Sequence, residues 1–147
     1  MAKGMCIIIW ALGPMVTEAL KIAGRLAAEE GLSVGVVNAR FIKPLDAALL
    51  ADVWRRHREV FTLEENTIVG GFGAGVLEWA AERDEQHPQH VTCVGIPDAF
   101  QEHDTRAELL AGMGLDAASL ADRVATRLAE VRGDDAGSGS ARAGSAS

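Results

Sequence analysis

Residues 60–75 read VFTLEENTIVGGFGAG, and this stretch decides the predicted fold. The apolar strand pattern Val60–Leu63 runs into two adjacent carboxylates, Glu64 and Glu65. Four glycines then follow within residues 70–75, before a helical pattern. In an open α/β sheet, ligands or partner surfaces meet the edge where strands end and the following helices begin. Glycines there allow close approach of backbone N–H groups, and a helix N-terminus favours an anion. This edge therefore holds the first candidates for a functional site.

The flanking sequence alternates strand patterns with amphipathic helix patterns. Strands are predicted at residues 5–10, 32–38, 59–63 and 90–96, and helices at 15–30, 47–57, 73–83, 105–111 and from 117 onward. Short strands that alternate with helices favour a mostly parallel sheet covered on both faces. We therefore predict an α/β fold of three α/β/α layers, with a sheet of four to five strands. The pattern leaves open an antiparallel position of the first strand at one edge.

Composition points to one domain of ordinary size. We assign residues 3–132 to the α/β domain and residues 133–147, which are Gly, Ser, Ala and charge, to a disordered tail. The net charge of −7 and the pI near 5.0 argue against a nucleic-acid partner. No apolar run approaches the roughly 20 residues that span a bilayer, and residues 5–12 form a strand pattern without a cleavage region. We expect a cytoplasmic protein without a membrane partner.

The cysteines favour a structural role. Cys6 and Cys93 both fall in predicted strands, so we expect buried free thiols in a reducing compartment; a disulfide would need the two strands to be adjacent. Two cysteines could form a zinc site only together with histidines at matching spacing, and the four histidines show no such pattern: His57, His87, His90 and His103. The sequence predicts no metal-binding residues.

The glycine cluster matches no phosphate-binding motif in full. Gly71-Phe72-Gly73 begins like a dinucleotide fingerprint, but Val76 occupies the place of the third glycine. No lysine follows the glycines, as a P-loop requires. Tight packing of the helix on the strand, or a contact surface, is therefore favoured over a phosphate cradle.

The charged residues at strand ends have structural as well as functional interpretations. Glu64 and Glu65 are adjacent on an extended chain and point to opposite faces, so we do not expect a catalytic pair. One of them is predicted to accept hydrogen bonds from backbone N–H groups of the next helix. Arg40 and Lys43, at the end of the second strand, could hold an anion or pair with either glutamate, and pairing is favoured. Asp46 is predicted to cap the following helix.

A second polar pair follows the last strand. Asp98 and His103 lie in its exit loop. An Asp and a His without a nucleophile or metal partner more often order a loop than catalyse a reaction. The residues alone therefore indicate a compact α/β domain with interaction features and no complete active site.

Several segments, taken together and in order, resemble the C-terminal domain of 1-deoxy-D-xylulose-5-phosphate synthase. These segments are Val36–Asp46, Thr62–Asn66, Gly70–Gly73, Gly95–Phe100 and Glu102–Asp116. The likeness covers residues 3–131. The C-terminal domains of transketolase and of 2-oxoacid dehydrogenase decarboxylase subunits are more distant, because Arg-Phe-x-Lys-Pro-Leu-Asp at residues 40–46 is typical of the synthase. Asp104 departs from the glycine that usually follows the histidine in that family.

The resemblance implies a part of a larger enzyme. The family enzyme is a thiamine diphosphate-dependent transferase that condenses pyruvate with glyceraldehyde 3-phosphate for isoprenoid, thiamine and pyridoxal synthesis, and it requires magnesium. Its cofactor-binding and catalytic residues belong to two earlier domains, so we expect none in this chain. The partners implied are those cofactor-binding domains, in cis or as a separate chain, and a second copy in a homodimer. The candidate interdomain contact residues are Arg40, Lys43, Glu64, Glu65, Gly70, Gly71, Phe72, Gly73, Asp98 and His103.

Two other functions fit the same residues. One is a free-standing α/β module that binds an acidic or phosphorylated small molecule through Arg40, Lys43 and the glycine turn. The other is a subunit of a split transketolase-like enzyme. As a synthase C-terminal domain, the chain alone is expected not to be catalytic and to be competent only beside the other domains.

Overall fold

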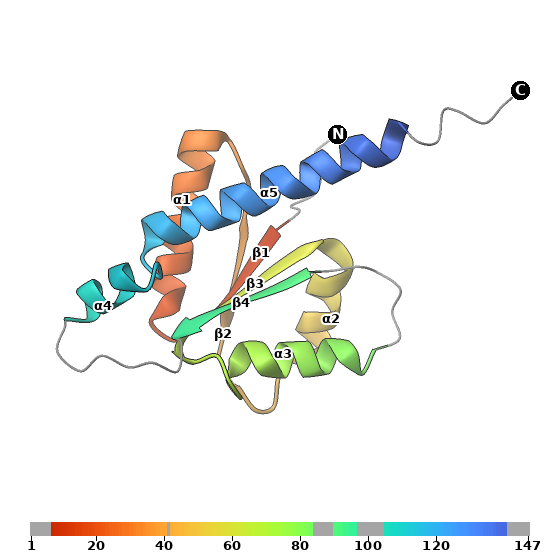
Figure 1. Cartoon of the computed structure of the whole chain (residues 1–147). Helices are drawn as coiled ribbons and strands as arrows, with labels where there is room; N and C mark the ends of the chain where they lie inside the picture. The colour runs from red at the N-terminus through yellow and green to blue at the C-terminus, as the bar shows by residue number, and fades with distance from the viewer. Residues whose placement is uncertain (1–6, 41, 84–89, 97–104, 141–147) are drawn as a thin grey trace, which may run out of the picture.

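The computed structural model describes residues 7–40, 42–83, 90–96 and 105–140 (Figure 1). Strands and helices alternate along the chain up to the last strand. The strands are β1 (Ile7–Leu12), β2 (Gly35–Ala39), β3 (Glu59–Thr67) and β4 (His90–Ile96). The helices are α1 (Met15–Glu30), α2 (Ala47–Arg56), α3 (Phe72–Ala81), α4 (Arg106–Gly112) and α5 (Ala117–Ser140).

The four described strands form one parallel sheet in the order β2-β1-β3-β4. β1 lies inside this sheet, where Trp10 pairs with Val37 of β2 and Thr62 of β3. The possibility of an antiparallel first strand at an edge is therefore wrong. The physical reason is the composition of β1: Ile7–Ala11 is apolar without interruption and is buried on both faces, which suits a central parallel strand.

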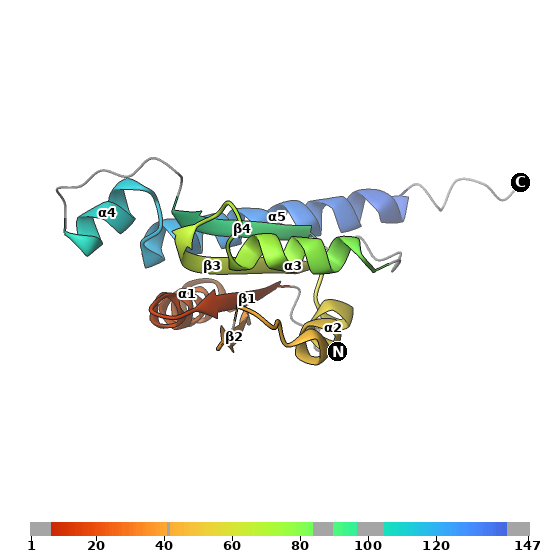
Figure 2. The same cartoon turned by 90° about the horizontal axis from the view of Figure 1, so that it is seen from below.

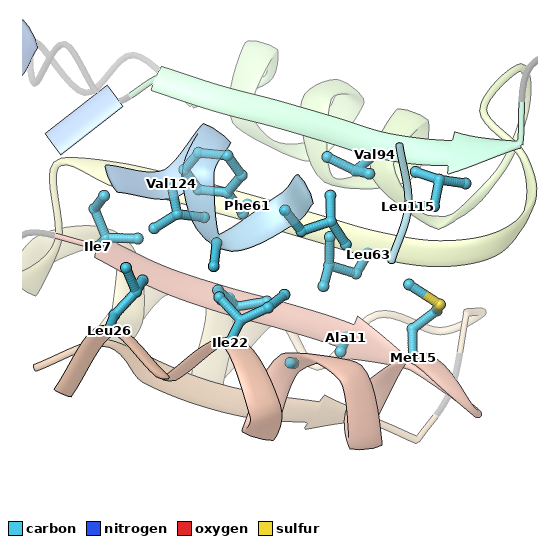
Figure 3. Close-up of a cluster of buried hydrophobic side chains, with 14 of the residues drawn as sticks. Ile7, Ala11, Met15, Ile22, Leu26, Phe61, Leu63, Val94, Leu115 and Val124 are labelled. Atoms are coloured by element: carbon cyan, nitrogen blue, oxygen red, sulfur yellow. The ribbon is translucent and has the colours of Figure 1, made fainter. Parts of the chain in front are cut away.

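Helices cover both faces of the sheet, and this confirms the predicted three-layer α/β/α fold. α1 and α5 lie on one face, and α2 and α3 lie on the other (Figures 1 and 2). Side chains of β1, β3, α1 and α5 meet in the larger of two apolar cores (Figure 3). Its centre includes Ile9, Ile22 and Phe61, each at most 2% exposed. The smaller core, below α2 and α3, contains Trp10 and Phe72.

The helix ends follow the sequence signals. α1 ends at Gly31, whose φ of +63° suits a residue without a side chain and whose N–H donates to the Ala27 carbonyl. The Asp46 carboxylate accepts a 3.0 Å hydrogen bond from the Leu49 N–H and caps α2, as predicted. The predicted capping box of α4 is also present, with Thr105 and Glu108 bonded reciprocally.

Several element boundaries differ from the prediction, most of all the ends of β3 and α5. β3 continues to Thr67 and not only to residue 63, because pairing with β4 resumes at Thr67 after an irregularity. α5 continues as a helix through residues 133–140, which the sequence assigns to the tail. Residues 133–140 include three glycines and one alanine, so their own helix propensity is low, and the segment extends α5 by propagation, which adds a hydrogen bond for each residue fixed. Residues 141–147 lie outside the described residues, and disorder of the tail stays a prediction.

Of the two cysteines, Cys93 lies within the described residues. Cys93 in β4 is a half-buried free thiol. Burial raises the pKa of the Cys93 thiol, and the Thr62 hydroxyl opposes that effect. A thiol with a raised pKa is a weak nucleophile near neutral pH, which agrees with a packing role. Cys6 lies outside the described residues.

Candidate functional site

The centre of the candidate site is the buried carboxylate of Glu64. Glu64 is 2% exposed, and its Oε2 accepts a 2.9 Å hydrogen bond from the Gly73 N–H in the first turn of α3. This confirms that one of the two glutamates interacts with backbone N–H groups of the next helix. Burial raises the pKa of Glu64 above its ordinary value, while the N–H groups of Gly73 and Phe72 act in the opposite direction. The protein's own carboxylate thus takes the position at which a helix N-terminus would bind an anion.

The glycines near Glu64 are required by close packing. A Cβ on Gly71 would overlap the Glu64 carboxylate and lie 2.5 Å from the Thr67 carbonyl oxygen. A Cβ on Gly73 would lie 2.5 Å from Thr62 Oγ1 and 2.7 Å from the sulfur of Cys93. These distances are far below van der Waals contact. The close approach of α3 to the sheet is therefore possible only because Gly71 and Gly73 carry no side chain. The preference for tight helix-to-strand packing over a phosphate cradle agrees with this geometry.

Glu65 points to the opposite face of β3, as the alternation of an extended chain requires. Its two oxygens accept hydrogen bonds from Arg106 at the start of α4, at 2.5 Å from Nε and 3.1 Å from Nη2. Glu65 in turn raises the pKa of Arg106. The ion pair ties the end of β3 to α4 across the carboxyl edge of the sheet.

The predicted pairing of Arg40 or Lys43 with Glu64 or Glu65 is wrong. The strand order places β1 between β2 and β3, so the two strand ends are not neighbours. Glu64 accepts a hydrogen bond from the Gly73 N–H of α3, and Glu65 forms an ion pair with Arg106. Arg40 and Lys43 are exposed and form no ion pair with any residue that the structure describes. Asp98 and His103 lie outside the described residues.

The candidate contact residues that the structure describes differ in burial, and Glu65 and Gly71 are half-buried. Glu64, Phe72 and Gly73 are buried inside this domain. They pack beneath the surface at the carboxyl edge of the sheet. The exposed group consists of Arg40, Lys43 and Gly70, next to Val69, whose side chain is 75% exposed. Gly70 has a φ of +68°, which a residue with a side chain rarely adopts, so the turn before α3 needs glycine here.

Two ion pairs were not anticipated from the sequence. One is Arg106–Glu65, across 41 residues of chain; the other joins Arg127 of α5 to the buried Glu59 of β3, across 68 residues. Arg127 donates to both Glu59 oxygens, at 3.1 Å from Nε and 3.0 Å from Nη2. Helical and strand periods identify partners a few residues apart, and no local signal identifies partners this distant.

The remaining site chemistry is limited in the described part of the chain. No group of three or more His, Cys, Asp or Glu side chains lies close enough together there to hold a metal ion. No helix found there is long and apolar enough to cross a membrane. The arrangement at the carboxyl edge is therefore one of packing, capping and surface charge.

Comparison with known proteins identifies the family. Residues 2–120 match the family model described as "Transketolase, C-terminal domain". The chain belongs to the transketolase C-terminal domain family. A match over this length covers all the described strands and, of the described helices, α1 to α4 completely. The three-layer fold described above is thus a transketolase C-terminal domain fold.

Curated relatives of this transketolase C-terminal domain are 1-deoxy-D-xylulose-5-phosphate synthases, which confirms the resemblance found in the sequence. The protein from Pelotomaculum thermopropionicum is 44% identical over 129 residues, covering 88% of this chain and 20% of the relative. The protein from Syntrophotalea carbinolica is 46% identical, covering 86% of this chain and 20% of the relative. The chain thus spans about a fifth of the length of the curated relatives it matches.

A solved structure supports the same fold assignment. It is described as "Split gene transketolase, inactive beta4 tetramer" and superimposes with a TM-score of 0.73 at 36% identity. The match covers 84% of this chain and 39% of that chain. The transketolase C-terminal domain therefore also occurs within a transketolase encoded by a split gene.

Proposed function

We propose that this chain is the C-terminal domain of a 1-deoxy-D-xylulose-5-phosphate synthase, acting in the cytoplasm. The observation that carries the proposal is its identity of 40–46% to synthases over 78–91% of its length. The complete enzyme would condense pyruvate with glyceraldehyde 3-phosphate, using thiamine diphosphate and magnesium. In this proposal the residues that hold both cofactors belong to the other domains, and this chain supplies interdomain and dimer contacts.

The proposed contact surface is the carboxyl edge of the sheet. It is formed by Arg40, Lys43, Glu65 and the turn at residues 68–71. Val69 is its exposed apolar member. Its cations are Arg40 and Lys43, which form no ion pair within the described part of the chain, so the surface combines an apolar contact with two charges that a partner can neutralise. Asp98 and His103 remain candidates for the same surface. Buried Glu64 keeps the turn in place without touching a partner.

A domain exchange tests this proposal. In the synthase of Pelotomaculum thermopropionicum, the matching C-terminal fifth would be replaced by residues 1–132 of this chain. The purified chimera should form 1-deoxy-D-xylulose 5-phosphate from the two substrates, and the same enzyme without a C-terminal fifth should not. A chimera that is dimeric and binds thiamine diphosphate yet forms no product would contradict the proposal.

Two controls make the exchange specific. In the chimera, Lys43→Glu with Arg40→Glu should weaken assembly, because both cations become anions on the proposed contact surface. Arg123→Glu on α5, which is exposed and outside the proposed contact surface, should leave assembly unchanged.

Calorimetric titration of the isolated chain with thiamine diphosphate and magnesium should give no micromolar binding.

A second candidate is a separate subunit of a split transketolase-like enzyme, favoured by the split-gene transketolase neighbour at 36% identity. It makes a different prediction about assembly. The chain would then bind a separate chain that carries the cofactor-binding domains, and transferase activity would appear only on mixing the two. Native mass spectrometry of the chain with the product of an adjacent reading frame distinguishes this case from a fused enzyme.

A further inference from the structure

β4 forms one edge of the sheet, and it pairs with β3 alone among the described strands. The His90 N–H donates a 3.0 Å hydrogen bond to the Arg58 carbonyl, so the backbone groups of His90 point toward β3. Backbone groups alternate between the two sides of a strand. Those of Thr92 therefore also point toward β3, and those of Val91 and Cys93 point outward from the sheet.

Residues 91–93 lack the features with which natural proteins block a free strand edge. The usual protection is a charged side chain, a proline or a bulge. Residues 91–93 read Val-Thr-Cys, and the irregularity in the pairing of β3 with β4 begins only after Val94. All three residues are half-buried, whereas Val94 and Gly95 are buried. A partner strand can therefore reach this edge as far as Cys93.

This short edge is complementary to a second copy of itself. In antiparallel pairing, two opposite residues that both point toward the partner exchange two hydrogen bonds. The register that uses both outward residues places Val91 of one copy opposite Cys93 of the other, with Thr92 on the twofold axis. A contact of this symmetry uses the same surface on both copies and closes as a dimer.

The charges beside the edge fit the same axis. A groove of about 370 Å³ lies between Thr92 and the side of α5 that runs from Asp122 to Glu130. α5 runs along β4 in the opposite chain direction (Figures 1 and 2). A twofold axis at Thr92 therefore sets the two copies of α5 antiparallel, with the exposed Arg123 of one opposite the exposed Glu130 of the other. Arg127 of the same chain donates a 2.9 Å hydrogen bond to Glu130 and holds it in place.

We propose that the free edge of β4 and the adjacent side of α5 form a self-association surface, through which two copies of this chain join their sheets into one. The contact consists of backbone pairing at Val91 and Cys93 and of ion pairs between Arg123 and Glu130. It lies in the amino-terminal half of β4, away from the proposed contact surface at the carboxyl edge. It therefore does not depend on the proposed synthase function. Arg123→Glu should weaken this self-association and leave the assembly of the chimera unchanged.

Sedimentation velocity of the full chain measures the self-association. The average mass should rise from 15.5 kDa toward twice that value as the concentration increases to about 1 mM, a range that includes weak specific contacts. Hydrogen exchange should slow at the Val91 and Cys93 amides over the same range, and less at the Thr92 amide, which already faces β3. A mass that stays at one copy, or that grows beyond two, would overturn the proposal.

Val91→Pro tests the backbone pairing. Proline removes an outward N–H and keeps the hydrogen bonds between β3 and β4, so the variant should fold and remain a monomer at about 1 mM. Val91→Ala is the matched control, because it also loses the valine side chain but keeps the N–H. It should associate as the unchanged chain does. A folded Val91→Pro chain that still forms the dimer would contradict the proposed pairing.

Charge reversal on α5 tests the register without altering β4. Arg123→Glu alone and Glu130→Lys alone each place like charges together at both symmetric contacts, so each should associate at least about tenfold more weakly. A mixture of the two variants has opposite charges at both contacts and should recover most of the association. Arg132→Gln, exposed on α5 outside the groove lining, should have no effect. The proposal fails if the mixture associates no better than either variant alone.

Discussion

The carboxylate of Glu64 accepts a 2.9 Å hydrogen bond from the backbone N–H of Gly73, nine residues later in the chain. This contact joins the end of β3 to the first turn of α3 and fills the anion-attracting end of the helix with a buried side chain. It explains why a strand, two carboxylates and a glycine turn occur together without a phosphate site.

Gly71→Val should prevent or severely weaken folding. A Cβ at residue 71 would overlap the Glu64 carboxylate and lie 2.5 Å from the Thr67 carbonyl oxygen, and both atoms belong to the buried edge. We expect a loss of at least about 3 kcal/mol in the free energy of unfolding, the upper part of the range for overpacking. Gly75→Ala on the same helix is the matched control, since its Cβ would meet only Leu45 at 3.7 Å. Urea denaturation compares the two, and equal stability would contradict the packing argument.

Glu64→Gln should change how stability depends on pH. The folded pKa of Glu64 is raised above 4.5, so the folded state binds more protons than the unfolded state in the window above that value. Stability from this group is therefore present below about pH 4.5 and decreases as the pH rises to the folded pKa. Glutamine keeps an acceptor for the Gly73 N–H and does not titrate.

The difference in urea midpoint between Glu64→Gln and the unchanged chain measures that effect. It should grow in favour of the glutamine variant from about pH 4 to pH 7, since the other carboxylates titrate equally in both proteins and cancel. A difference that is constant with pH would show that Glu64 has an ordinary pKa in the folded state.

Arg127→Gln should destabilise the fold by about 3 kcal/mol, at the low end for breaking a buried ion pair because Arg127 keeps some contact with solvent. The substitution leaves the Glu59 carboxylate, which is 1% exposed, without its bidentate partner. Arg123→Gln, exposed on the same helix, should change stability by less than about 0.5 kcal/mol. Restoration of most of the loss by Glu59→Gln in the Arg127→Gln background would show that the unpaired charge is the cause.

The exposed pair between Arg106 and Glu65 should contribute little to stability. A double-mutant cycle with Arg106→Ala and Glu65→Ala should give a coupling of about 0.2–1 kcal/mol, because the arginine is half exposed and its charge is screened by salt. The coupling should fall further in about 1 M salt, where the screening length is about 3 Å. A coupling above about 2 kcal/mol would indicate a more rigid edge.

Truncation after Arg132 should leave the stability of the domain unchanged within about 0.5 kcal/mol. The last buried residue that the structure describes in α5 is Val131, and the sequence of residues 133–147 contains no large apolar side chain that could extend the core. The melting temperature of the shortened chain measures this. A clear loss would show that residues 133–147 pack on the domain, and the boundary at residue 132 would then be wrong.

Much of the candidate site could be predicted from local patterns. The two glutamates alternate between faces as any extended chain does, and the capping residues Asp46 and Thr105 occupy the positions that their sequence spacing indicates. The missing third glycine and the missing lysine of the motif predict close packing for the glycines at residues 71 and 73, and the structure has it. The partners predicted for Arg40 are wrong, because only the strand order shows which strand ends are neighbours.

The sequence by itself determined the alternation of strands and helices, the parallel sheet with two covered faces, and the family. These properties depend on periods of two and 3.6 residues and on motifs only a few residues long. Only the tertiary structure decided that β1 separates β2 from β3, that Arg127 reaches Glu59 across 68 residues, and that Thr92 of β4 and one side of α5 border the same groove. Such pairings depend on which distant surfaces come together when the whole core is buried, and no local pattern carries that information.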